Sequence, residues 1–187
     1  MADDGSGKCS DFSFDPTVPD NKVVLLDGWC SSSVTHANGD IVVLPDGDFL
    51  ISVGDGAQPG GEDVGNLDGD QCYIPKMGLP QGRFKSQRLD FLHGKVVRIK
   101  AASLLSDGPL SRNDYTYAAI GLRNPYAMTR DPVTGDVYVG DVGSSIKEEI
   151  NRILKEDLTT GNVLNFGWPC VEGTSWVLEQ DWVTAEC

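Results

Sequence analysis

Two similar stretches constrain the fold of this chain more than any other feature. LPDGDFLISVGDG, ending at Gly56, and DPVTGDVYVGDVG, ending at Gly143, share one order: a turn of Asp, Pro and Gly, a strand, then Gly-Asp and a further Gly. With the strands before them, both predict β-hairpins. The equivalent residues Val53 and Val139 are 86 positions apart (139 − 53). A propeller blade takes about 40–50 residues, so this spacing fits two blades, or one blade with a long insertion.

The remaining patterns also predict an all-β chain. Self-similar antiparallel units are typical of a β-propeller, in which each blade buries its faces against its neighbours. A β-sandwich fits the same alternation and remains an alternative. Residues 94–100, GKVVRIK, predict one further strand, and residues 57–93 read as a long loop that is functional or cross-linked. Residues 145–158 have some helical spacing, but we expect a turn followed by a strand there.

Charge and length exclude several function classes. The chain of 187 residues has 15 basic and 28 acidic side chains and a net charge of −13. Nucleic acid binding needs clustered Lys and Arg, so we expect no nucleic acid partner. No apolar run approaches the roughly 20 residues that span a bilayer, so we expect no membrane-spanning segment. The start, MADDGSGKCS, does not resemble a secretory signal, which leaves an intracellular chain or a true start elsewhere.

The cysteines leave two readings open. No two of them have the spacing of a zinc knuckle. Either the thiols are free or buried, or they form one or two disulfides, which would indicate an oxidising compartment. The five are Cys9, Cys30, Cys72, Cys170 and Cys187.

Four strings, taken in order, resemble one protein family. They are HANGDIVVLPDGDFLISVGDGA, GKVVRI, GLRNPYAMTRDPVTGDVYVGDVG with EEINRI, and NFGWPCVEG. Together they cover about residues 23–173 and are similar to the soluble pyrroloquinoline-quinone (PQQ)-dependent sugar dehydrogenases, also called the glucose/sorbosone dehydrogenase family. The hedgehog-interacting proteins share this propeller.

The resemblance implies a fragment of a six-bladed β-propeller with four-stranded antiparallel blades. The chain has room for about three to four blades. We expect an N-terminal extension over residues 1–22 and a partial propeller domain over 23–187, with the long insertion at 57–93. The resemblance implies that the missing blades lie on both sides.

The resemblance also implies a catalytic site. His36 matches the family's general base, and an imidazole suits removal of a sugar hydroxyl proton because it titrates near neutral pH. Without the resemblance, a lone His before a strand is more often structural. Arg123 and Asn124 match the pair that contacts the quinone, for which a fixed guanidinium is suited. Glu148 aligns with an acidic residue near the cofactor. The structural alternative for Arg123 is a surface salt bridge.

Calcium is the second implied cofactor. Gly143 and Ser144 match residues whose backbone carbonyls hold the cofactor-bound Ca²⁺, which readily accepts such oxygens. Glu149 and the carbonyl of Phe166 are assigned to a second, structural calcium site. For both Glu148 and Glu149 a solvated acidic turn is the alternative.

Other residues are given mainly structural roles. Asp55 and Asp141 are expected to close blade turns by accepting backbone N–H bonds, and Trp168 is favoured as core packing over sugar stacking. His93 has no matching role and is expected to be a loop residue. Asp68 and Asp70 form a weak calcium motif.

Two features of the family's branches also bear on this chain. Cys30 and Cys72 resemble a disulfide of the secreted branches, which implies a secreted or extracellular protein. Thr35 departs from the family pattern, because an acidic residue precedes the base in the bacterial glucose enzyme.

The implied function is that of a quinoprotein sugar dehydrogenase, which transfers hydride from sugar C1 to PQQ with His36 as base. Its partners would be a sugar substrate and an external electron acceptor. Because the family's other cofactor contacts lie in blades outside this chain, we expect the chain alone to be inactive or nearly so. The alternative is a non-catalytic propeller that binds protein or glycan ligands.

Overall fold

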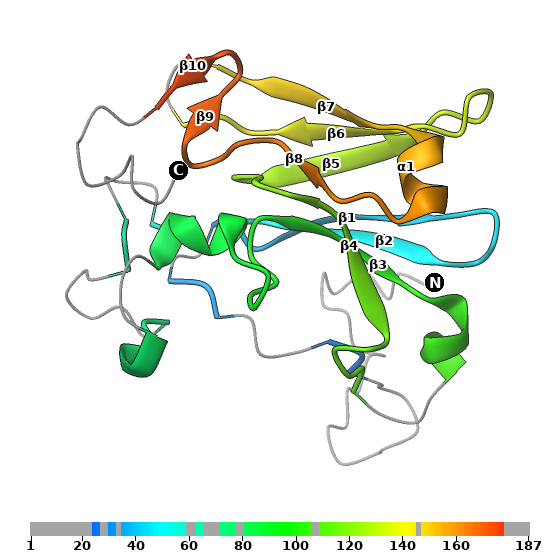
Figure 1. The fold of residues 1–187 in the computed structure, drawn as a ribbon, viewed down its shortest axis with the longest axis horizontal. Coiled ribbons are helices and arrows are strands. Elements are labelled where there is room, and N and C mark those ends of the chain that lie inside the picture. Colours follow the sequence, from blue (N-terminus) through cyan, green and yellow to red (C-terminus); the bar gives the residue numbers. More distant parts are fainter. Residues whose placement is uncertain are drawn as a thin grey trace, which may run out of the picture.

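The computed structural model describes residues 24–26, 30–32, 35–58, 63–65, 72–77, 81–105, 109–144 and 147–177. The predicted extension 1–22, the domain boundary at residue 23, and Asp68 and Asp70 lie outside these residues. The described part is built mainly from antiparallel strands in two large sheets that lie side by side (Figure 1). No helix in this part is long and apolar enough to cross a membrane.

The first sheet contains the first predicted hairpin. Its order is β1-β2-β3-β4-β8, with β1–β4 antiparallel and β8 parallel to β4. At the hairpin turn, Leu44 N donates to Asp48 O, and Gly47 has a φ of 87°, which favours glycine. The strands are β1 (Asn38–Val43), β2 (Phe49–Val53), β3 (Lys95–Ile99), β4 (Tyr115–Ile120) and β8 (Leu164–Asn165).

The second sheet contains the second predicted hairpin and one further strand. Its antiparallel order is β5 (Pro125–Arg130), β6 (Val137–Asp141) and β7 (Glu149–Ile153). The preference for a strand over a helix in EINRI is therefore confirmed. A short helix, α1 (Lys155–Thr160), follows β7 and was not predicted. Its C-cap is Gly161 with a φ of 74°, a common way for helices to end.

The short elements complete the description. A two-stranded sheet pairs β9 with β10, and within the described residues three short 3₁₀ helices lie in the connections. They are β9 (Val171–Glu172), β10 (Ser175–Trp176), η2 (Pro75–Met77), η3 (Gly82–Gln87) and η4 (Ala101–Leu105).

The main core lies between the two large sheets. Alternate residues of β6 point into it, since Val137 and Val139 are fully buried while Tyr138 is half-buried. Leu50 and Val96 contribute from the first sheet, and Met128 and Ile153 from the second. A second cluster on the other face of the first sheet includes Val53, Val97 and Ile99. The first sheet is therefore covered by apolar side chains on both faces, as in a propeller blade.

The sheets approach most closely where β1 lies beside β5. Ser52 Oγ donates to Pro125 O at 2.7 Å, and Met128 N donates to Asp40 Oδ2 at 2.9 Å. A Cβ atom at Gly39 would lie 2.0 Å from Pro125 O, which is shorter than any real contact. Glycine is therefore required at residue 39 for this junction.

The predicted loop 57–93 is held to the first sheet at several points. The disulfide between Cys30 and Cys72 is present, as the resemblance implied. Lys85 Nζ donates to Cys72 O at 3.0 Å. Beneath η3, the fully buried Lys95 donates from Nζ to the carbonyls of Lys85, Ser86 and His93 at 3.0, 2.6 and 2.6 Å. This part of the loop is therefore cross-linked covalently and by hydrogen bonds.

The fold class is confirmed: the chain has an all-β, partial β-propeller fold, and β1–β4 form a four-stranded antiparallel blade. Two sheets of blade size lie in the described residues, compared with the three to four estimated from length. The reason is that long connections between β2 and β3 and between β3 and β4 contain only short 3₁₀ helices in their described parts.

Lys95 provides a test of how the connection before β3 is held. Lys95→Met keeps the aliphatic bulk but leaves three buried carbonyls without their donor, so we expect the free energy of unfolding to fall by about 1–3 kcal/mol. Urea denaturation measures this loss. Lys100→Met, at an exposed position just after β3, is the control and should change stability much less. Equal effects would contradict the role of Lys95.

Candidate functional site

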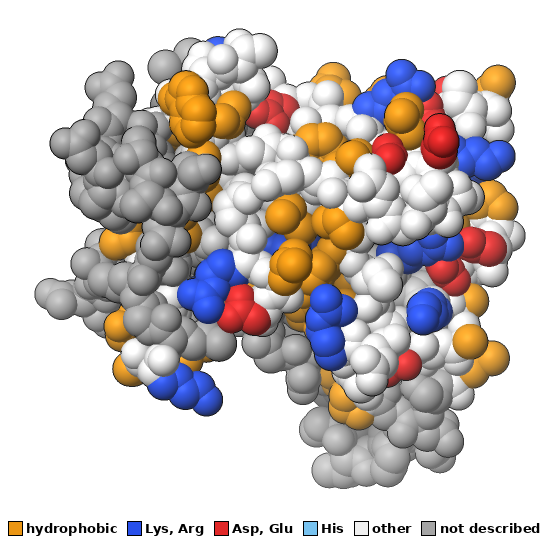
Figure 2. All heavy atoms as spheres, in the orientation of Figure 1, with side chains coloured by type: hydrophobic (Ala, Val, Ile, Leu, Met, Phe, Trp, Pro, Cys, Tyr) orange, Lys and Arg blue, Asp and Glu red, His pale blue; other side chains and the backbone are white. Residues whose placement is uncertain are grey.

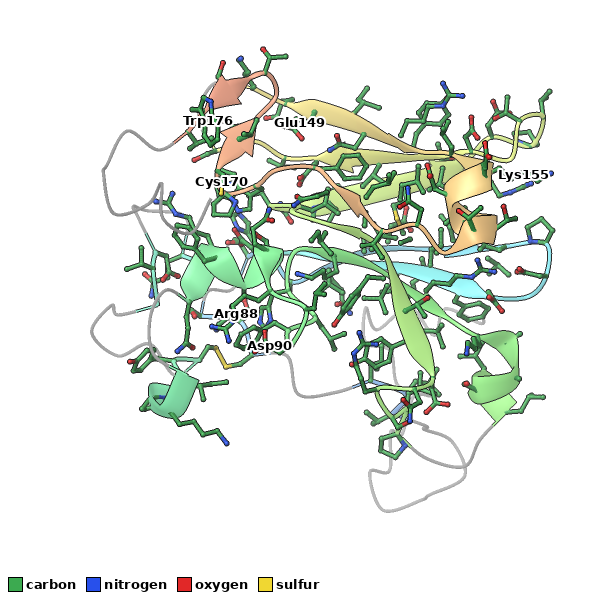
Figure 3. The ribbon with its side chains drawn as sticks, viewed as in Figure 1. Arg88, Asp90, Glu149, Lys155, Cys170 and Trp176 are labelled. Atoms are coloured by element: carbon green, nitrogen blue, oxygen red, sulfur yellow. A yellow bond between two sulfur atoms is a disulfide. The ribbon has the colours of Figure 1, made fainter. Side chains whose placement is uncertain are left out.

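Most of the predicted site residues lie at one end of the two sheets. Asp55 follows β2, Arg123 precedes β5, Gly143 follows β6 and Glu149 begins β7. Because neighbouring strands are antiparallel, the residues that follow β2 and β6 lie at the same end of the sheets as the residues that precede or begin β5 and β7. The segment from Asn165 to Gly173 reaches the same end, which is marked in Figure 3 by Glu149 and Cys170, opposite Lys155.

His36 and Asp55 form a buried pair. His36 Nδ1 lies 2.9 Å from Asp55 Oδ1, and the two residues are only 8% and 1% exposed. His36 has a φ of 55°, which is uncommon for a residue other than glycine. Its carbonyl accepts Gly56 N, and a Cβ at Gly54 would lie 2.3 Å from that carbonyl. The Gly-Asp-Gly turn therefore holds this strained residue against the carboxylate.

Asp55 does more than the predicted turn closure. Its Oδ1 does accept a backbone amide, Ala57 N at 2.9 Å, as expected. In addition, Oδ2 accepts Trp168 Nε1 at 2.8 Å, and Asp55 N donates to Arg123 O. Trp168 is 5% exposed, in line with the preference for core packing. One carboxylate thus connects the candidate base to the NFGWP segment.

Arg123 is fixed in place by the turn after β6. Its Nη1 donates to Val142 O at 2.9 Å and Gly143 O at 2.8 Å, and its guanidinium carbon lies 5.5 Å from the centre of the Trp168 ring. With 7% exposure, Arg123 does not form the surface salt bridge considered as the alternative. Asp141 accepts the backbone amides of Arg123 and Asn124 at 2.9 and 2.6 Å, which is the predicted structural role.

The two glutamates bind the turns around them. Glu148 Oε2 accepts Gly143 N at 3.1 Å. Glu149 accepts Asn151 Nδ2 at 2.9 Å and also Gly173 N. Ser144 N donates to Glu172. These carboxylates fix the turn after β6 and the segment leading to β10, so the acidic turn is ordered by specific hydrogen bonds.

A metal site is not identified by side-chain clustering. Within the described ranges, no group of three or more His, Cys, Asp or Glu could hold a metal ion. The predicted calcium ligands Gly143, Ser144 and Phe166 act through carbonyl oxygens, which such a cluster does not include. The Gly143 carbonyl is engaged by Arg123. Calcium therefore stays a prediction.

Two small cavities bring the site residues together. One is lined by His36, Asp55, Ala57, Gln58, Arg83, Arg123, Ser144 and Trp168. The other, which shares Arg123 and Trp168, is lined also by Asp141, Val142, Gly143, Glu149, Val171 and Glu172. Three predicted site residues, Asn124, Glu148 and Phe166, do not line either cavity.

Arg83 is the main residue that sequence reasoning missed. It lies in η3, is 6% exposed, and its guanidinium carbon is 6.0 Å from the centre of the Trp168 ring. Trp168 therefore has a guanidinium from Arg83 and one from Arg123 in contact range. The sequence places Arg83 in a long loop, and no spacing within that loop indicated that it would reach His36.

The other histidine differs from His36. His93 precedes β3, as expected for a loop residue, but it is buried, and its Nε2 donates to Cys30 O at 2.7 Å. Burial, with Lys85 and Lys95 nearby, lowers the pKa of His93 to about 4. It is therefore neutral at physiological pH and lies outside both cavities.

These features define a partial β-propeller. At one end of its sheets, the connecting loops place a His-Asp pair, a buried tryptophan and two buried arginines around one cavity. A model of the glucose/sorbosone dehydrogenase family matches residues 11–181. The chain belongs to that family.

Two relatives show how much of the family's length the chain represents. An uncharacterized protein of Synechocystis sp. is 31% identical over 159 residues, covering 82% of this chain and 33% of that protein. The crystal structure of the apo-form of the soluble aldose sugar dehydrogenase from Escherichia coli matches with a TM-score of 0.42 and 22% identity, covering 73% of this chain and 33% of that one. The chain thus spans about a third of the length of these relatives.

The raised pKa of Asp141 predicts that the stability of the fold depends on pH. Burial, together with Glu149 and Asp55, raises the pKa of Asp141 to about 7 against the two amide donors that favour the charged form. A carboxyl with a raised folded pKa stabilises the fold fully below its unfolded pKa, near 4, and loses that contribution as pH rises through 7. Relative to Asp141→Asn, we expect wild-type stability to fall by roughly 1–4 kcal/mol across this window. Urea titrations at several pH values measure the difference, and a constant difference would contradict the raised pKa.

Proposed function

We propose that this chain contributes part of the active site of a PQQ-dependent sugar dehydrogenase. In this proposal His36 is the general base, and Arg123, Asn124 and Glu148 lie around the quinone. The observation that carries the proposal is the buried His36–Asp55 pair beside two arginines and Trp168 in one cavity. Membership of a sugar dehydrogenase family supports it.

The charge of the cavity fits an anionic quinone. Arg83 and Arg123 are both buried, and arginine is the residue best suited to buried ion pairs with carboxylates. Fixed guanidinium groups bind carboxylates and stabilise negative charge that develops on an oxygen. Trp168, whose ring centre lies 6.0 Å and 5.5 Å from these two guanidinium carbons, adds an aromatic group to the same cavity. The residues present are therefore suited to a planar, polycarboxylated ligand.

His36 is oriented for proton abstraction. The carboxylate of Asp55 can only accept, so Nδ1–H of His36 donates to it, and Nε2 is left as the basic nitrogen. When bound, the quinone would accept the hydride from sugar C1. His36 Nε2 would take the hydroxyl proton from the same carbon, and Asp55 would stabilise the resulting imidazolium. Trp168 holds the second oxygen of Asp55 and so keeps this pair aligned.

Calcium and location are parts of the same proposal. The carbonyls of Gly143 and Ser144 would hold the cofactor's Ca²⁺, with Gly143 O using the lone pair that does not accept Arg123 Nη1, and Glu149 with the Phe166 carbonyl would hold a structural Ca²⁺.

Cys170 is disulfide-bonded in addition to the Cys30–Cys72 pair. Disulfides persist mainly in oxidising environments, which supports a secreted or extracellular protein.

The rest of the site would come from further blades. Because the chain spans about a third of its relatives' length, we propose that the complete protein containing it supplies the remaining cofactor contacts. An external electron acceptor would then reoxidise the quinone. The chain alone would hold half of a site and show little or no turnover.

The test compares variants of the complete protein, loaded with PQQ and Ca²⁺, in a dye-linked assay over a panel of aldoses. His36→Gln should lower kcat by about 100- to 10,000-fold because the base is lost. Asp55→Asn should cause a smaller loss, and the double variant should be little worse than His36→Gln because the two residues act as a unit. The matched control is Asp90→Asn, an exposed carboxylate paired with Arg88, which should retain full activity.

The outcomes separate the competing functions. Full activity in His36→Gln would remove His36 as base without removing the dehydrogenase. Equal, quinone-independent background in wild type and variant would favour the non-catalytic binding propeller. Turnover by the 187-residue chain at the rate of the complete protein would contradict the half-site proposal.

A further inference from the structure

A cleft lies at the opposite end of the sheets from the candidate site. It is formed by the turn between β1 and β2, the turn between β5 and β6, the end of β3, and α1. Both turns and α1 lie at the same end of the sheets (Figure 1). It encloses about 480 Å³ of space, including its open mouth. All residues that line this cleft lie in the described part of the chain, and none of them lines the cavities of the candidate site.

The floor of the cleft is apolar. Leu44 and Leu158 are 6% and 8% exposed and belong to the main core, and Pro45 lies beside them. Thr159, which is exposed, also lines the cleft. A ligand here would rest its apolar part on packed side chains.

The charged lining is mainly cationic, with three cations and one carboxylate. Arg98 is satisfied by Asp46 and Asp48, each at 2.6 Å, and by the carbonyl of Leu158. Arg130 and Lys155 are different: their side chains have no hydrogen-bond or ion-pair partner among the residues that the structure describes. Figure 2 shows basic side chains on the side of the molecule that carries α1. Arg130 is half-buried and Lys155 is exposed, so both cationic groups remain accessible to a ligand in the cleft.

The nearby acids are already engaged. Asp136 binds Arg152 at 2.6 Å and accepts Lys155 N, and Asp131 accepts the amides of its own turn. The side chains of Arg130 and Lys155 both pass close to Gly135, because a Cβ there would lie 3.1 Å from Arg130 Nη2 and 3.0 Å from Lys155 Cδ. Its φ of 83° also favours glycine.

We infer that this cleft binds a small organic oxyanion, a carboxylate or phosphate ester with an apolar body. Arg130 and Lys155 bind the anionic group, and Leu44 and Leu158 receive the apolar body. Arginine and lysine both form charge-assisted hydrogen bonds to such oxygens. The inference is independent of the proposed function, since none of these residues belongs to the dehydrogenase site.

Titration calorimetry of the 187-residue chain tests the inference with phenyl phosphate, benzoate, inorganic phosphate and the uncharged benzyl alcohol. We expect phenyl phosphate or benzoate to bind with a Kd of about 1 mM or tighter. Inorganic phosphate and benzyl alcohol should bind more weakly, because each lacks one half of the recognition. The stronger of the two organic anions then distinguishes a phosphate ester from a carboxylate.

Variants locate the binding. Arg130→Gln and Lys155→Gln should each weaken it by at least about tenfold, while Lys76→Gln, an exposed lysine of η2 outside the cleft, should not. In the wild-type chain, the amide chemical shifts of Gly135, Leu158 and Thr159 should move when the organic anion is added. This measurement locates the binding without any variant, so it does not depend on whether a variant folds. Equal weakening by Lys76→Gln, benzyl alcohol binding as tightly as benzoate, or no binding of either organic anion at about 10 mM would overturn the proposal.

Discussion

The buried carboxylate of Asp55 is the interaction on which the candidate site depends. It accepts His36 Nδ1, Ala57 N and Trp168 Nε1, and the amide of the same residue donates to Arg123 O. One residue thereby joins both sheets and the segment that follows β8. A buried carboxylate is costly unless it is fully hydrogen-bonded, so these partners and the carboxylate require one another. Loss of one partner would leave a buried oxygen of Asp55 with fewer hydrogen bonds, at a cost in stability.

The two ends of the sheets carry different groups of side chains. At one end, connections between and within blades place charged and aromatic side chains around small cavities, with turns fixed by Asp141 and the glutamates. At the other end, tight hairpin turns and α1 enclose a cleft over the core. The junction of β1 and β5, where Gly39 admits the Pro125 carbonyl, sets the distance between the sheets and so shapes both ends.

Local patterns predicted the elements well and the site in part. Alternation around Asp, Pro and Gly turns encoded both hairpins, and the strand Glu149–Ile153 was correctly preferred to a helix. The Cys30–Cys72 disulfide and the roles of His36 and Arg123 came from resemblance, and only the disulfide is observed directly. Arg83 and the second role of Asp55 were missed because neither depends on neighbouring residues. The buried anchor Lys95 was also missed, since its carbonyl partners lie in a segment without a regular pattern.

The sequence alone determined the two hairpins, the strands β3 and β7, the all-β class and the acidic character that argues against nucleic acid. These follow from side-chain alternation, turn chemistry and charge, which are properties of short segments or of the whole composition. Only the tertiary structure decided which distant residues meet. Asp55 and Trp168 are 113 positions apart, yet they share a hydrogen bond. Arg130 and Lys155 likewise converge on Gly135 only because β5 and α1 lie at one end of the second sheet. Such contacts depend on how the sheets pack, and no local pattern records that packing.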